Sequence, residues 1–134
     1  IEQYIEGSEY TVDCVFDKNS KLVFALPRER IIKSNLSIVG KISKNKKIMK
    51  YINSLSSQIN FIGNVNIQII LDRQKKIHLT DINPRVSGSI IFSILAGFNP
   101  FTLAYSINNN KKILRPKNIK YGKIFYRYWK TYKK

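Results

Sequence analysis

The sequence has almost none of the residues that build disulfides, zinc sites and thiol or imidazole active sites. Cys14 is the only cysteine, so no internal disulfide can form, and a reducing, cytoplasmic location is expected. It stands among strand-forming residues with no histidine near it, which favours a small buried side chain over a nucleophile. His78 is the only histidine, and zinc-ligand spacing is absent. Strand alternation would turn His78 away from Asp81, toward a surface or packing role.

Other common signatures are also missing. The six glycines form no phosphate-binding loop of the Walker type, which disfavours a P-loop enzyme. The longest apolar run, residues 90–98, is interrupted by Ser93 and Gly97 and is too short to cross a bilayer, so no membrane partner is expected. The N-terminus lacks a basic and apolar leader, and export is not expected. With 134 residues and 43% hydrophobic content, residues 1–134 can form a single domain with its own core.

Acidic residues are scarce and unevenly placed. The 24 Lys and Arg residues outnumber 8 Asp and Glu residues, giving a net charge of +16, and no acidic residue follows Asp81. A basic C-terminal half interleaved with aromatic residues would suit a nucleic-acid-binding module, because cations displace phosphate counterions and rings stack on bases. We favour a solvated lysine-rich face, because no RNA-binding signature is present, and nucleic acid is not expected as a partner.

The chemistry of the chain concentrates in residues 79–88, which read LTDINPRVSG. If this stretch begins as a strand, its period of two puts the side chains of Asp81 and Asn83 on one face. Pro84 lacks a backbone donor and fits the end of the strand, followed by a loop that carries Arg85. Carboxylate and amide oxygens suit Mg²⁺ together with phosphate oxygens, and arginine grips a phosphate with two donors.

A second polar residue is predicted to join this face. Residues 64–71 alternate between polar and apolar side chains, and the residues after them supply a turn, so they form a hairpin with the strand just described. The register that matches apolar with apolar pairs Ile67 with Ile82 and Ile70 with Leu79. Gln68 then falls opposite Asp81, and a slip of one residue would flip every side chain. Gln68, Asp81 and Asn83 would form a polar trio on an otherwise apolar sheet.

This hairpin resembles the C-terminal metal-binding part of an ATP-grasp domain, of the carbamoyl-phosphate-synthetase-like members. The matching segments are NVNIQ at residues 64–68, INPRVSGS at residues 82–89 after an acidic residue, and AGFNP at residues 96–100. The resemblance implies that Gln68, Asp81 and Asn83 hold Mg²⁺ or Mn²⁺ bridging the phosphates of ATP. It also implies that Arg85 binds the nucleotide and contacts the transferred phosphoryl group as a catalytic residue.

Two positions depart from the family pattern. The family usually has Glu where this chain has Asp81, whose side chain is one methylene shorter, so a metal would sit closer to the strand or keep an extra water. Gly88 stands where some members carry a second arginine, so the function of that arginine is not carried over.

The N-terminal stretch IEQYIEGSEYTVD, residues 1–13, resembles the adenine hinge of the same family and the strand that returns beneath the nucleotide. The resemblance implies that Glu2 lies beside the adenine amino group, that the Tyr4 backbone bonds the ring edge, and that Glu9 bonds the ribose hydroxyls. The chemistry is consistent, because backbone groups can read adenine and a carboxylate accepts from two vicinal hydroxyls.

The resemblance implies an ATP-dependent ligase. Such an enzyme phosphorylates a small-molecule carboxylate, and an amine or thiol nucleophile then displaces phosphate from the acyl phosphate. The chain begins at Ile1, within a predicted strand, and an ATP-grasp site needs a preceding subdomain. We therefore expect a C-terminal ATP-grasp fragment of a longer enzyme, inactive without the N-terminal subdomains of the same chain. Two alternatives stay open: the basic nucleic-acid-binding module, and a degenerate ATP-grasp domain kept for interaction.

The predicted fold class is α+β, a mostly antiparallel sheet with helices packed on one face. Besides the hairpin, strands are predicted at residues 10–16, 22–26 and 124–129, and helices at residues 45–59, 89–96 and 101–107. Ser87 or Ser89 would cap the second helix. Residues 27–30 are expected to leave the sheet, with Arg28 and Arg30 either facing a substrate carboxylate or phosphate, or forming a solvent-facing pair around Glu29.

Overall fold

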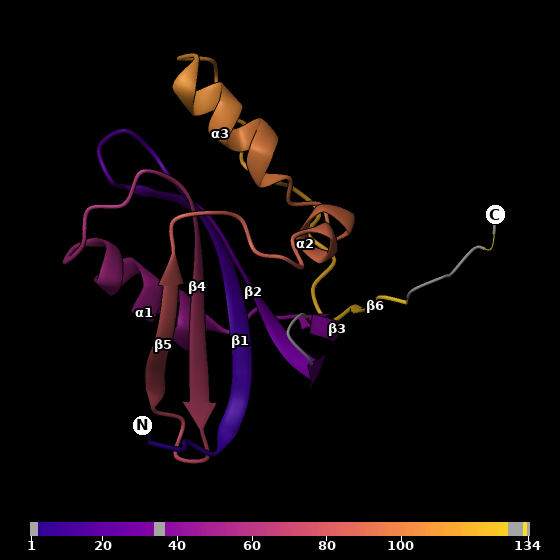
Figure 1. Ribbon diagram of the computed structural model, residues 1–134. Helices are drawn as coiled ribbons and strands as arrows, with labels where there is room; N and C mark the ends of the chain where they lie inside the picture. Colours follow the sequence, from indigo (N-terminus) through magenta and orange to yellow (C-terminus); the bar gives the residue numbers. More distant parts are fainter. Residues whose placement is uncertain (1–2, 34–36, 129–132, 134) are drawn as a thin grey trace.

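The computed structural model describes residues 3–33, 37–128 and 133. Within these residues, six strands form one sheet in the order β5-β4-β1-β2-β3-β6, with antiparallel neighbours throughout (Figure 1). The strands are β1 (Gly7–Phe16), β2 (Leu22–Lys33), β3 (Ser37–Ile42), β4 (Gly63–Asp72), β5 (Ile77–Asn83) and β6 (Ile124–Tyr126). The helices are α1 (Lys46–Ser56), α2 (Ile91–Leu95) and α3 (Pro100–Asn108). The expected α+β class with a mostly antiparallel sheet is confirmed.

The helices divide between the two faces of the sheet, whereas the sequence analysis placed them on one. Cross-strand partners share a face, so Val12 in β1 and its partner Ile67 in β4 point the same way, toward α1. Val15 and Leu26 point to the opposite face and pack with residues that follow α2 and form α3. In Figure 1, α1 runs behind the sheet, while α2 lies at its upper right and α3 above it. We call these the α1 face and the open face.

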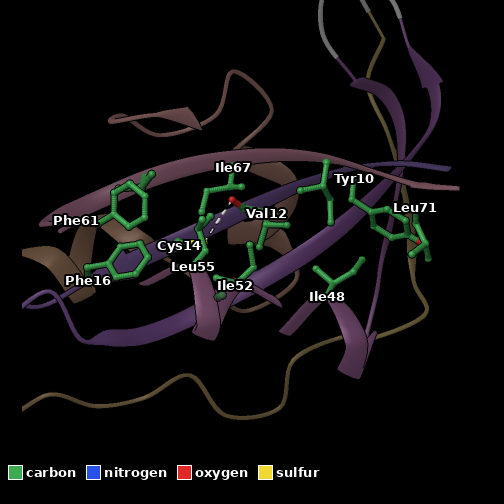
Figure 2. Close-up of a cluster of buried hydrophobic side chains, with 13 residues drawn as sticks. Tyr10, Val12, Cys14, Phe16, Ile48, Ile52, Leu55, Phe61, Ile67 and Leu71 are labelled. Atoms are coloured by element: carbon green, nitrogen blue, oxygen red, sulfur yellow. Dashed lines mark hydrogen bonds between the residues drawn. The ribbon is translucent and has the colours of Figure 1, made fainter. Parts of the chain in front are cut away.

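The α1 face carries a continuous apolar core. Ile48, Ile52 and Leu55 recur at helical spacing and point from α1 into the sheet (Figure 2). The sheet and the connection after α1 contribute Tyr10, Val12, Cys14, Phe16, Ala25, Phe61, Val65, Ile67, Ile69 and Leu71. Burial raises the pKa of the Cys14 thiol, which confirms its expected packing role. The Asn45 side chain caps α1, accepting from the amide N–H groups of residues 47 and 48.

The open face carries a second, smaller core at the end covered by α2 and α3. Gly97 follows α2 with φ of 102°, and the N–H of Phe98 donates to the carbonyl of Ser93 at 2.9 Å, which ends the helix in a Schellman motif. Asn99 caps α3. The predicted cap of α2 by Ser87 or Ser89 is wrong, because Ile90 stands at the N-cap and no side chain in the described part of the chain caps this helix. Among the described residues, no helix is long and apolar enough to cross a membrane.

Strand β2 continues through residues 27–30, which were predicted to leave the sheet. Pro27 lies opposite Val12 of β1, and its carbonyl accepts from the N–H of Ser43 at 2.9 Å. Its ring nitrogen therefore points to the β3 side of the strand. The pairing of β2 with β3 ends at Arg28, so the missing N–H of Pro27 interrupts no hydrogen-bond ladder. Strand β3 is not among the strands predicted from the sequence, and residue 129 of the predicted last strand lies outside the described residues.

Candidate functional site

The polar trio predicted from the sequence lies together on the open face. Two pairs follow the predicted register, Gln68 with Asp81 and Ile67 with Ile82. Asn83 lies opposite Asn66, two residues along β4 from Gln68. Because paired residues share a face and alternate residues return to it, Gln68, Asp81 and Asn83 point to the same side of the sheet.

A β-bulge interrupts this hairpin directly beside Asp81. The predicted pairing of Ile70 with Leu79 is wrong, since the observed pairs are Ile69 with Leu79 and Ile70 with His78. Thr80 is the extra residue, and it breaks the alternation on which the prediction depended. His78 consequently shares the open face with Asp81, so its predicted place on the opposite face is also wrong.

Hydrogen bonds link Asp81, Asn83 and Arg85 in a row. The amide Nδ2 of Asn83 donates to Oδ2 of Asp81 at 2.5 Å, and Nη2 of Arg85 donates to Oδ1 of Asn83 at 3.3 Å. Pro84 is the central residue of a tight turn in which the N–H of Arg85 donates to the carbonyl of Asn83 at 2.7 Å. The side chains of two predicted metal ligands and of the predicted phosphate-binding arginine are therefore linked, with Asn83 in the middle.

A small cavity of about 120 Å³ adjoins this row. Its lining residues are Thr11, Arg30, Ser37, Asn66, Gln68, Arg85, Ser87, Gly88 and Ser89. They come from β1, β2, β3 and β4 and from the loop after β5. The cavity thus brings Gln68 and Arg85 to one place, surrounded by hydroxyl groups and a second guanidinium.

Glu9 lies on the same face, toward the end of the sheet at which β1 begins. Its carboxylate Oε2 is 3.3 Å from Nη1 of Arg30, and both side chains are partly buried. Arg30 thus lines the cavity described above instead of standing in solvent.

Tyr4 lines a separate hollow of about 280 Å³, near the start of β1 and the β4–β5 turn. Its side chain is exposed, and His78 lines the same hollow. His78 Nε2 lies 2.7 Å from Oδ2 of Asp72, and this contact lowers the pKa of the Asp72 carboxyl. Glu2, the other predicted hinge residue, lies outside the described residues.

The position of Arg28 on the open face was not predicted from the sequence. Arg28 is fully buried and is paired with Asp13, so neither alternative considered for it, a substrate contact or a solvent-facing side chain, describes its position. A single acidic residue in the middle of an apolar strand was the available signal, because a buried carboxylate needs a cation or donors nearby.

Comparison with known proteins identifies the family. A family model described as "ATP-grasp in the biosynthetic pathway with Ter operon" matches residues 1–124. This chain is an ATP-grasp protein. The resemblance seen in the hairpin and the N-terminal stretch is therefore confirmed at the level of the ATP-grasp superfamily.

Solved ATP-grasp structures share the fold. N5-carboxyaminoimidazole synthetase from Staphylococcus aureus, complexed with ADP, matches 84% of this chain at 18% identity with a TM-score of 0.69. The biotin carboxylase domain of the Hydrogenobacter thermophilus 2-oxoglutarate carboxylase, in complex with MgADP, ADP and bicarbonate, matches 92% at 16% identity with a TM-score of 0.67. The phosphoribosylaminoimidazole carboxylase ATPase subunit from Aquifex aeolicus matches 89% at 14% identity with a TM-score of 0.70. The chain spans about a third of their lengths, 32%, 30% and 37% respectively.

Proposed function

We propose that this chain supplies the metal- and nucleotide-binding part of an ATP-dependent ligase that activates a carboxylate as an acyl phosphate. The observation that carries the proposal is the contact among Asp81, Asn83 and Arg85, opposite Gln68, on the open face of an ATP-grasp sheet. The chain would be the C-terminal part of the ATP-grasp domain, and the partners of this part would be the N-terminal subdomains of the same enzyme.

The donor set fits Mg²⁺ or Mn²⁺ held together with a nucleotide. Among the described residues there is no group of three His, Cys, Asp or Glu side chains that could hold a metal ion. The proposed ligands are one carboxylate, Asp81, and the amide oxygens of Gln68 and Asn83. Mg²⁺ characteristically binds through one or two carboxylates and completes its shell with phosphate oxygens and water. This set therefore suits a metal that arrives with ATP better than a metal bound alone.

Each residue would make a distinct contribution to phosphoryl transfer. The bound metal would neutralise charge on the phosphates. Arg85 would stabilise the charge on the transferred phosphoryl group. Catalysis of phosphoryl transfer depends mainly on such positioning and electrostatic stabilisation. The hydrogen bond from Arg85 to Oδ1 of Asn83, the atom proposed as a ligand, supports a site in which phosphate and metal would meet between these two residues.

The nucleotide would extend from this row toward the start of β1. Glu9 would accept from the ribose hydroxyls, and Glu2 and the Tyr4 backbone would bind adenine, as the family resemblance implies. The ADP and bicarbonate named in the related structures support a nucleotide and a small carboxylate as ligands. An amine or thiol nucleophile would complete the reaction, and the enzyme would act in the cytoplasm.

The proposal is tested by titrating the chain with MgADP, with and without excess EDTA, and following amide chemical shifts. We expect metal-dependent shifts at Glu9, Gln68, Asp81 and Asn83. Asp81→Asn removes the only carboxylate among the proposed ligands and should weaken MgADP binding about 10-fold or more, while leaving the fold intact.

Asp17→Asn is the matched control. It makes the same chemical change in the turn after β1, where the Asp17 side chain accepts two backbone hydrogen bonds. It should leave the MgADP affinity unchanged. Binding that survives Asp81→Asn, or salt-sensitive oligonucleotide binding with no response to nucleotide, would overturn the assignment and favour the nucleic-acid-binding alternative.

A further inference from the structure

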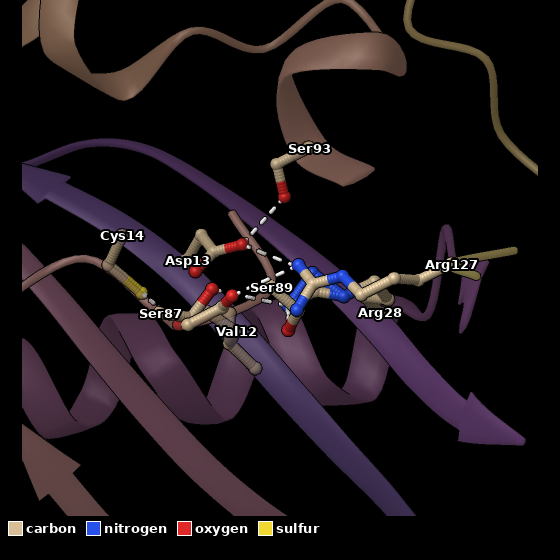
Figure 3. A network of polar contacts seen from close by, with 9 residues as sticks. Val12, Asp13, Cys14, Arg28, Ser87, Ser89, Ser93 and Arg127 are labelled. Atoms are coloured by element: carbon tan, nitrogen blue, oxygen red, sulfur yellow. Dashed lines mark hydrogen bonds and ion pairs between the residues drawn. The ribbon is translucent and has the colours of Figure 1, made fainter. Parts of the chain in front are cut away.

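A fully buried arginine connects the strands of the open face to the loop that carries Arg85 (Figure 3). The Arg28 side chain has no exposed surface, and that of Asp13 is 2% exposed. Nη1 of Arg28 lies 3.4 Å from Oδ2 of Asp13, while Nη2 donates to Oγ of Ser89 at 2.8 Å and to Oγ of Ser87 at 3.3 Å. One guanidinium thus joins β1 and β2 to two residues of the loop between β5 and α2.

The Arg28 side chain fits beside β3 because residue 40 is a glycine. A Cβ atom at Gly40 of β3 would lie 2.9 Å from Cδ of Arg28 and 3.1 Å from a ring carbon of Phe92. The guanidinium carbon of Arg28 is 5.6 Å from the centre of the Phe92 ring, within the range of a cation–π contact. Arg28 is therefore confined between β3 and α2, and a glycine makes the space.

Stability alone does not account for this arrangement. Burial lowers the pKa of the Arg28 guanidinium, Asp13 opposes that effect, and Arg30 and Arg127 add to it. Buried ion pairs are often no more stabilising than apolar side chains of similar volume. Moreover, Nε of Arg28 and Oδ1 of Asp13 are buried without hydrogen-bond partners among the described residues. The guanidinium is directed at the loop at the expense of its own hydrogen bonding.

The loop is held at three successive residues. Arg28 bonds the side chains of Ser87 and Ser89, and Nη2 of Arg127 donates to the carbonyl of Gly88 at 3.1 Å. All three loop residues line the same cavity as Arg85 and Gln68. Because Arg85 stands two residues before Ser87, the position of this segment fixes where its guanidinium can reach.

We propose that Arg28 is a positioning residue that acts through Ser87 and Ser89 to hold the Arg85 loop against the proposed metal ligands. This inference rests on the proposed function for its ligand, the terminal phosphate of ATP. A small displacement of a group that contacts a reacting phosphate is costly, because catalysis and binding depend on its placement. Arg28 itself touches no ligand.

Three variants separate positioning from folding. Arg28→Lys keeps the charge but places all its donors on one nitrogen, so it loses the planar fork that bonds Asp13 through Nη1 and the serines through Nη2. Gly40→Ala removes no polar group, but its added methyl group would displace the Arg28 side chain. Ser89→Ala removes the acceptor at 2.8 Å. Ile52→Val is the control, because it weakens the core of the α1 face far from the loop.

Calorimetric titration with a non-hydrolysable ATP analogue and with ADP, each with Mg²⁺, provides the readout. We expect Arg28→Lys, Gly40→Ala and Ser89→Ala each to bind the analogue about 10-fold more weakly than the unmodified chain. Binding of ADP should weaken less than about 3-fold, since Arg85 is proposed to contact the terminal phosphate. The effects of Arg28→Lys and Ser89→Ala should not add, because both break one interaction. Equal losses for both nucleotides, or additive effects, would overturn the inference. If Arg28→Lys does not fold, Ser89→Ala and Gly40→Ala decide between these outcomes.

Failure of the proposed function gives a different result, because the unmodified chain would then bind neither nucleotide. Hydrogen exchange then decides the inference. The N–H groups of Ile90 and Phe92 donate to the carbonyls of Ser87 and Ser89 at 3.1 Å. They should exchange about 10-fold faster in Arg28→Lys than in Ile52→Val, and equal exchange would show that Arg28 does not hold the loop.

Discussion

The two faces of the sheet are built on different principles. The α1 face is closed by a helix whose buried residues are all apolar, and its order comes from shape and volume. The open face buries Asp13, Arg28 and Asn66 among hydroxyl groups. Buried atoms without hydrogen-bond partners also gather there, and they include Oδ1 of Asp13, Oδ1 of Asn64 and Nδ2 of Asn66. Native proteins rarely leave such atoms unpaired.

This contrast assigns different tasks to the two faces. Substitutions on the α1 face change only the volume of apolar side chains, so they should change the free energy of unfolding. The open face should respond in ligand binding, and its stability should depend on keeping charges in pairs. Substitutions on each face can therefore test whether the division holds.

The largest effect is expected from breaking the buried ion pair. Asp13→Ala leaves the Arg28 cation buried without its carboxylate and should lower the free energy of unfolding by about 3–5 kcal/mol. The double variant Asp13→Leu with Arg28→Met removes both charges and should recover much of that loss. Urea unfolding of the three proteins checks this. If the double variant were less stable than Asp13→Ala, the open face would not depend on charge pairing.

A somewhat smaller loss is expected on the α1 face. Ile52 is fully buried, so Ile52→Ala should cost about 2–5 kcal/mol in the free energy of unfolding, without changing the MgADP affinity of the folded fraction. Ile62→Ala is the matched control, since Ile62 is 64% exposed, and it should cost less than about 0.5 kcal/mol. A large loss of affinity in Ile52→Ala would show that the two faces are coupled.

The smallest effect concerns the hairpin end of the open face. The hydrogen bond from His78 lowers the pKa of Asp72, and the backbone N–H of Lys76 acts in the same direction. A carboxyl whose pKa is lowered by folding stabilises the fold at pH values above its pKa in the unfolded chain, about 3.9. This stabilisation is lost as the pH falls through the pKa in the folded chain. Asp72→Asn should therefore be less stable than the unmodified chain near neutral pH, and the difference should shrink in acid. Urea midpoints across pH would contradict this if the difference grew below about pH 4.

Much of the open face could be anticipated from the sequence because it depends on local alternation. The pairing of Gln68 with Asp81 follows from matching apolar rows, and the turn at Pro84 follows from a missing N–H. The error at Leu79 has a single cause, the extra residue at Thr80, which polar and apolar patterns do not reveal. A prediction that counts alternate residues across Thr80 is therefore wrong by one position. The face predicted for His78 was wrong for this reason.

Arg28 shows a different limit. Its neighbours in sequence, Pro27 and Glu29, favour an exposed turn, and its partners Asp13 and Ser89 lie 15 and 61 residues away. Local propensity carries no information on such contacts. The space for its side chain depends on Gly40, and only the pairing of β2 with β3 brings that glycine beside it.

The bulge at Thr80 makes β5 adjustable in length at one point. Removing Thr80 would leave Leu79 opposite Ile69 and Asp81 opposite Gln68, so the pairing on both sides would stay as it is. Only the local bend and twist of the strand would change, because the extra residue of a bulge is itself unpaired in the ladder. Loss of this one residue would therefore change the direction in which Asp81 presents its carboxylate, while the hairpin turn and Asn83 keep their places.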